Sequence, residues 1–146
     1  MTDKYSKYFV TRYVKPKETN SWSPVYRPQD RTKILRLDKN SMRESKLFVE
    51  CTWFWPAMVE DRTLEQRSTK PHVHDYDEVL GLVGTNRDDP HDLGGVAEIT
   101  LNGETHVINK SCLIYIPANL KHGPFKQTKI TRPIFHFNSG MTGTHI

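Results

Sequence analysis

The chain has 146 residues, of which 36% are hydrophobic and 26% are charged, and its formal net charge is +4. This length fits one domain with a sizeable core, and the composition excludes a disordered chain. The positive charge is spread along the sequence and forms no run of lysines and arginines, which argues against a nucleic-acid-binding protein.

Residues 1–30 are rich in Tyr, Lys, Pro and Ser and precede the part of the chain that favours strands. Pro16, Pro24 and Pro28 disfavour regular helix in this segment. The sequence therefore predicts an extended N-terminal arm over 1–30, packed on the domain or on a partner subunit. A single β-domain is expected over 31–146.

From residue 31 onward, short runs of β-branched and aromatic residues are separated by glycine, proline and asparagine. We expect strands at 32–37, 47–55, 79–83, 96–101, 104–108, 113–116 and 134–137. Asn102-Gly103 predicts a tight hairpin, and the segment 85–95 predicts a long loop. No segment has the 3.6-residue apolar period of a long helix, and at most a helical turn is expected at 62–70. The pattern predicts an all-β sandwich or barrel.

Both cysteines, Cys51 and Cys112, lie in apolar, strand-like runs. This placement predicts buried free thiols and does not resemble a secreted disulfide framework. The first residues lack the apolar core of a signal peptide, and no apolar stretch approaches the roughly 18 residues of a membrane span. We therefore expect a cytoplasmic protein that does not bind membranes.

A cluster of metal-ligand residue types begins at His72. On an extended chain, His72 and His74 point to the same face, so both imidazoles can reach one ion. Glu78 follows after room for a tight turn and supplies a hard oxygen, and His122 can supply a further nitrogen. A set of this kind without sulfur suits Mn, Fe, Ni, Co or Zn. The sequence therefore predicts one divalent metal ion per chain.

These residues resemble the two sequence motifs of the cupin family. The first match is His72-x-His74-x3-Glu78 with Gly84 beyond it, and the second is Pro117-x-Asn119-x2-His122. The proline and asparagine of the second match suit a turn, and asparagine tolerates left-handed backbone geometry. The resemblance covers 72–84 and 111–126. It implies a small antiparallel jelly-roll β-barrel in which the three histidines and the glutamate bind one metal ion.

Other residues are candidates for contact with a substrate. His136 alternates with Phe135 and Phe137, so if the phenylalanines face one layer, His136 faces the other, where a metal cavity would lie. His136 and Tyr76 are the candidate catalytic residues, and Glu98 is a further candidate for a general base. The alternative for His136 is a structural histidine.

The cupin resemblance implies several activities and does not select one of them. We favour a metal-dependent enzyme acting on a keto acid, a hydroxy acid or a sugar derivative, as a dioxygenase, decarboxylase, isomerase or lyase. The alternatives are a non-catalytic ligand-binding or sensor module and a metal-free structural dimer. A homodimer is expected because the aromatic arm can add a strand to a partner's sheet.

Overall fold

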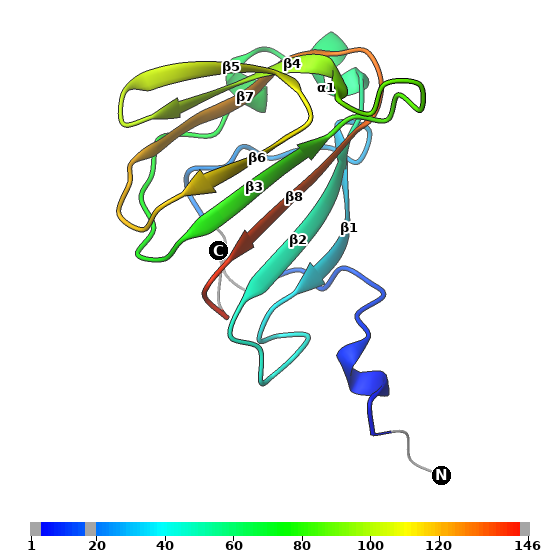
Figure 1. Cartoon of the computed structure of the whole chain (residues 1–146), viewed down its shortest axis with the longest axis vertical. Helices are drawn as coiled ribbons and strands as arrows, with labels where there is room; N and C mark the ends of the chain where they lie inside the picture. The colour runs from blue at the N-terminus through cyan, green and yellow to red at the C-terminus, as the bar shows by residue number, and fades with distance from the viewer. Residues whose placement is uncertain (1–3, 17–19, 144–146) are drawn as a thin grey trace.

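A computed structural model describes the chain over residues 4–16 and 20–143. Two antiparallel sheets pack against each other, one with five strands in the order β1-β2-β8-β3-β6 and one with three in the order β5-β4-β7 (Figure 1). The strands are β1 (Arg31–Leu37), β2 (Phe48–Phe54), β3 (Glu78–Val83), β4 (Asp92–Leu101), β5 (Glu104–Lys110), β6 (Cys112–Ile116), β7 (His122–Ile130) and β8 (Ile134–Gly140). Short helical segments are η1 (Ser6–Tyr8), α1 (Ala57–Asp61) and η2 (Glu65–Arg67).

The all-β prediction is confirmed, with one refinement to the expected barrel. Within the described residues, no strand of one sheet pairs along its length with a strand of the other. The sheets therefore form an open sandwich, and isolated bridges such as that between His72 and His122 join the segment before β3 to β7.

Strand β2 shows why these sequences fold as strands with one buried face. Its side chains alternate between buried and half-buried positions, and Phe48 and Phe54 lie on the inward face. On the opposite face, Trp53 stacks on Trp55 at 5.8 Å between ring centroids and meets Phe135 of β8 edge to face. Trp53, Trp55 and Phe135 thus form an aromatic cluster on the face of the sheet that points away from the core.

Most predicted strands are found with ends shifted by one to three residues, and the elements differ more from the prediction in three places. Strand β4 begins at Asp92 and not at Val96, so the preceding loop is shorter than the predicted 85–95. Strand β7 was not predicted, because Gly123 and Pro124 near its start disguise it. Helix α1 was also missed. The predicted hairpin is confirmed, since Asn102 and Gly103 have positive φ values of 46° and 84° between β4 and β5.

Outside the sheets, the described part of the arm contains only the helical turn η1. The boundary between arm and domain at residues 30 and 31 stays a prediction. Cys51 and Cys112 are free thiols, as predicted, but both are half-buried and not buried as the apolar runs around them predicted. No helix in the described ranges has the length and apolar character needed to cross a membrane.

Candidate metal centre

Two histidines that are 50 positions apart in the sequence are held side by side by their backbones. The amide of His72 donates to the carbonyl of His122 at 2.8 Å, and the amide of His122 donates to the carbonyl of His72 at 3.0 Å. This reciprocal pair is a short antiparallel bridge, which places both side chains on one face. The imidazole ring centroids lie 4.3 Å apart.

The turns that carry the two motifs are fastened to each other. The amide of Asn119 donates to the carbonyl of His74 at 2.7 Å, and Asn119 has the positive φ of 69° expected at this turn. The carboxylate of Asp77 accepts hydrogen bonds from the Tyr115 hydroxyl at 2.6 Å and from the Ala118 amide at 2.8 Å. The hydrogen bond from Tyr115, followed by that from Ala118, lowers the pKa of Asp77. Asp77 therefore links the turn of the first motif to that of the second, and we call this pair of hydrogen bonds the latch.

The structure brings the predicted ligands together. One ligand atom from each of His72, His74 and His122 lies within 4.8 Å of the others. Glu78, only 3% exposed, places its carboxylate oxygens 3.5 Å from Nε2 of His122 and 4.0 Å from Nε2 of His74. The three imidazoles thus form one cluster, and the buried carboxylate of Glu78 lies beside two of them.

Backbone carbonyls select the tautomer of two of these imidazoles. Nδ1 of His72 lies 2.7 Å from the carbonyl of Lys70, and Nδ1 of His122 lies 2.9 Å from the carbonyl of Leu120. A carbonyl oxygen only accepts, so Nδ1 carries the proton in both rings. The Nε2 lone pairs are then available to a metal ion, which is the usual arrangement of metal-binding histidines.

The electrostatic state of His122 reflects its carboxylate neighbour. Burial alone would lower the pKa of His122, but hydrogen bonding to Glu78 and to the Leu120 carbonyl outweighs burial and raises it. The buried Glu78 thus attracts positive charge, and a metal ion is one source of that charge.

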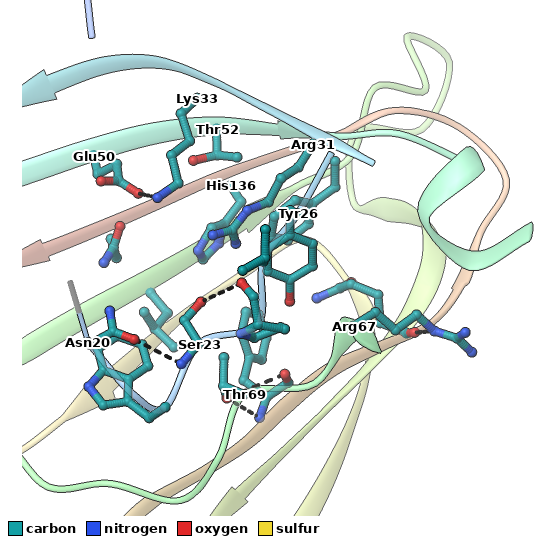
Figure 2. Close-up of a pocket in the computed structure, with 18 of the residues that line it drawn as sticks. Asn20, Ser23, Tyr26, Arg31, Lys33, Glu50, Thr52, Arg67, Thr69 and His136 are labelled. Carbon is teal, nitrogen blue, oxygen red and sulfur yellow. Dashed lines mark hydrogen bonds and ion pairs between the residues drawn. The ribbon is translucent and has the colours of Figure 1, made fainter. Parts of the chain in front are cut away.

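The histidine cluster borders a cavity of about 390 Å³, which is partly shown in Figure 2. His72 and His122 line the cavity together with Phe125 and Gln127 of β7, and Glu78 lines it from the start of β3. This volume falls within the range of small-molecule sites in proteins, about 300–1,000 Å³.

The five-stranded sheet, to which Glu78 belongs, supplies one wall of the cavity in rows that follow the strand register. Lys33, Thr52 and His136 form one row across β1, β2 and β8. Arg36, Glu50 and Asn138 form the next row. Because β1 contains a bulge between Lys33 and Leu35, its inward positions shift from odd to even numbers, which brings Arg36 into the wall.

His136 faces this cavity, as the alternation with phenylalanines predicted (Figure 2). Its Nδ1 lies 2.8 Å from the carbonyl of Gly81, so Nδ1 carries the proton and Nε2 is an acceptor. The ring stacks on Phe54 at 4.8 Å and is 7% exposed. Burial lowers the pKa of His136 to about 4, and the Arg31 charge lowers it further, so the ring is neutral near pH 7.

The other two candidate bases lie elsewhere. Tyr76 stacks on the ring of His74 at 4.8 Å and meets Phe48 edge to face, and it is not among the residues that line the cavity. Glu98 forms an ion pair with Lys126 at 3.2 Å between β4 and β7, and it does not line the cavity either. Tyr76 packs against His74 of the cluster, and its catalytic role stays a prediction.

Sequence reasoning missed the contribution of residues 20–26 and of β1. Trp22 stacks on His72 with centroids 4.0 Å apart, and its carbonyl accepts from the Lys70 amide at 2.6 Å. Tyr26 and Arg31 line the same cavity (Figure 2). The alternation of basic residues at Arg31 and Lys33 was the available signal for this wall.

No family model and no curated protein matches the sequence, whereas solved structures resemble its fold. A conserved protein of unknown function from Streptococcus pyogenes is 11% identical with a TM-score of 0.51, over 92% of this chain and 96% of that one. Oxalate oxidase in complex with glycolate is 14% identical with a TM-score of 0.50, over 81% of this chain and 54% of that one. An RmlC-like cupin from Shewanella frigidimarina is 10% identical with a TM-score of 0.49, over 93% and 95% of the two chains.

These identities show the fold alone: the chain has the cupin fold that its two motifs predicted. It spans about half the length of the oxalate oxidase chain, 54%.

Proposed function

We propose that this protein is a metal-dependent enzyme that acts on a small oxygen-rich molecule. His72, His74, Glu78 and His122 would hold one divalent ion. The observation that carries the proposal is the cluster of three imidazoles, two of them beside the 3%-exposed carboxylate of Glu78, at the wall of a cavity of about 390 Å³.

The donor set fits a divalent ion of the first transition row. The carbonyl-bound Nδ1 atoms leave Nε2 of His72 and His122 as ligands, and Glu78 contributes a hard anionic oxygen. This set suits Mn, Fe, Ni, Co or Zn, because it has nitrogen and oxygen donors and no sulfur. When bound, such an ion supplies Lewis-acid polarisation of a substrate oxygen.

The side chains around the cluster would bind and orient the substrate. Nε2 of His136 accepts a hydrogen bond from a substrate hydroxyl, since its Nδ1 is committed to Gly81. Trp22 and Tyr26 close part of the cavity and limit the entry of water. Tyr76 holds the ring of His74 by stacking.

One observation favours the alternative of a non-catalytic ligand-binding module. A general base works best when its pKa is near the operating pH, and the pKa of His136 is about 4. A weakly basic imidazole suits ligand recognition better than proton abstraction. Substrate turnover would distinguish the two functions.

The test of the metal site is elemental analysis of protein isolated without added metal and dialysed extensively. We expect about one divalent ion per chain in the wild type and a large loss in His72→Ala, Glu78→Ala and His122→Ala. His106→Ala is the matched control, because His106 is exposed on β5. Full occupancy in two or more of the ligand variants would refute the site. Comparing aerobic and anaerobic samples would separate iron from redox-inert ions.

We also propose that the protein forms a homodimer. Leu113 and Tyr115 are 68% and 59% exposed on β6, an edge strand of the larger sheet, and an exposed apolar edge favours pairing with another chain. Light scattering at high micromolar concentration should give twice the chain mass of 17.0 kDa. A monomer mass would count against the dimer.

A further inference from the structure

Most charged groups of the larger sheet's cavity wall neutralise one another. Nζ of Lys33 lies 3.4 Å from Glu50, and Arg36 pairs with both Glu50 and Asp38. Two cations, Lys33 and Arg36, thus meet two carboxylates, Glu50 and Asp38, which leaves this part of the wall with little net charge. Figure 2 shows Lys33 and Glu50 joined within the wall.

Arg31 differs from these neighbours. Its guanidinium group has no hydrogen bond or ion pair to any residue within 4–16 and 20–143, and its Nε is buried. Burial of the guanidinium lowers the pKa of Arg31, although the nearby Tyr26 and Glu50 oppose this shift. The wall therefore presents to the cavity a cation that no carboxylate of the described residues contacts directly.

Tyr26 holds this cation in a defined orientation. The central carbon of the Arg31 guanidinium lies 3.8 Å from the centroid of the Tyr26 ring, a stacked cation–π contact (Figure 2). Stacking on one face leaves the edges of the guanidinium plane as donors. The planar fork of donors matches a carboxylate, which it binds with two parallel hydrogen bonds.

We propose that the cavity binds a small carboxylic acid whose carboxylate is received by Arg31 while its other oxygens face the histidine cluster. The contact with the histidine cluster rests on the proposed function, whereas the contact with Arg31 does not. Arg31, His136, His72 and Glu78 line the same cavity, so one molecule can contact both Arg31 and the cluster.

The charge of the cavity favours a carboxylate over a phosphate. Glu50 and Glu78 line the cavity and would repel a dianion more strongly than a monoanion. Arg67 also lines the cavity, but two of its nitrogens already donate to the carbonyls of Gln127 and Arg62. The guanidinium of Arg31, which donates to no residue in the described part of the chain, is the group open to a carboxylate.

The test is calorimetric titration of the protein as isolated, with its metal content measured on the same sample. Mandelate, succinate and 2-oxoglutarate are the carboxylate probes, mandelamide is the neutral counterpart of mandelate, and inorganic phosphate is the competing anion. We expect at least one of the three carboxylates to bind, and phosphate to bind more weakly than that carboxylate. If mandelate binds, it should bind more tightly than mandelamide.

Arg31→Met should weaken binding of that carboxylate about 10- to 100-fold, the range for a lost charge-assisted pair. Arg31→Lys keeps the charge without the fork and should recover only part of the affinity. Tyr26→Phe, which keeps the ring, should bind as the wild type does, whereas Tyr26→Ala should bind more weakly. Arg87→Met, at an exposed loop position, is the charge-matched control.

Thermal melts of each variant establish that the chain is folded before titration. Arg31-dependent carboxylate binding without bound metal would uphold this inference and refute the proposed metal function. Bound metal with no carboxylate binding, with preference for phosphate, or with equal affinity in wild type and Arg31→Met would overturn this inference and leave the metal site intact.

Discussion

The interior of the sandwich has an apolar end and a polar end, and single strands run through both. In β3, Leu82 is fully buried at one end and Glu78 is buried at the other. In β8, Ile134 is fully buried, whereas His136 and Asn138 face the cavity. The same two-residue alternation therefore builds a hydrophobic core and a candidate site, and only the residue type at inward positions distinguishes them.

The two ends differ in what stabilises them. At the apolar end, removal of nonpolar surface from water drives packing, as in the cluster that includes Leu82, Leu93 and Ile99. At the polar end, buried charges are unfavourable unless they are paired, and the structure pairs Glu50 with Lys33 and Arg36. The apolar end should therefore dominate folding, and the polar end should dominate binding.

The largest expected effect is on the apolar end. Leu82→Ala should lower the free energy of unfolding by about 2–5 kcal/mol, because it leaves a cavity in a fully buried position. Urea denaturation of the metal-depleted protein measures this loss. His122→Ala should lose less stability in the same assay, and elemental analysis of the variant isolated without depletion should show that it has lost most of its metal. If both variants lost both properties to a similar extent, the division between the two ends would be wrong.

His136 should make the polar end sensitive to pH. Its imidazole has a pKa of about 4 in the folded chain and about 6.5 when unfolded, so the unfolded chain binds the proton more tightly. The folded state is then most stable above pH 6.5 and loses about 3 kcal/mol as the pH falls to 4. His136→Gln should reduce the slope of the free energy of unfolding against pH between about pH 4 and 6.5 by the contribution of one proton. An unchanged pH profile in the variant would contradict the assignment.

Metal removal should have an effect of similar or smaller size. An ion that binds only the folded chain stabilises it by about 2.7 kcal/mol when free metal is about 100 times its dissociation constant. Chelator should therefore lower the melting temperature at pH 7.5, and less so below about pH 6, where protonation of the histidines already releases the metal. A melt that ignores chelator, with metal loss verified, would show that the ion contributes little to folding.

The smallest effect is expected at the latch between the motifs. Asp77→Asn weakens the bonds from Tyr115 and Ala118, which are exposed to solvent in part, so folding should change little. Metal affinity should fall modestly, because the turn before Glu78 is held less firmly. Asp88→Asn, in the exposed loop after β3, is the control. Equal metal affinities in Asp77→Asn and Asp88→Asn would show that Asp77 does not support the metal site.

Much of the fold and the cluster could be predicted because local signals were strong. Asn102-Gly103 defined its hairpin, and His72 and His74 shared a face through strand alternation. The closeness of His122 required the motif resemblance, since the two backbone bonds that join it to His72 span 50 positions.

The cavity wall could not be predicted from local patterns. The bulge after Lys33 changes which residues of β1 face inward, and a bulge leaves no clear mark in the sequence. Trp22 lies in a segment without regular structure, so no periodicity shows that it reaches His72. The isolated charge of Arg31 depends on the pairing of its neighbours, which is a tertiary property.

The stacking of Trp22 on His72 gives the protein an intrinsic optical reporter. Trp22 is in van der Waals contact with a proposed ligand, whereas Trp53 and Trp55 stack together on the outer face of the larger sheet. Indole emission responds to the charge and electronic structure of adjacent groups, so occupation of the cluster should be readable from Trp22 alone. In a chain with both outer tryptophans changed to Phe, an open-shell ion such as Mn or Ni would quench this emission, and closed-shell Zn would shift it without comparable quenching.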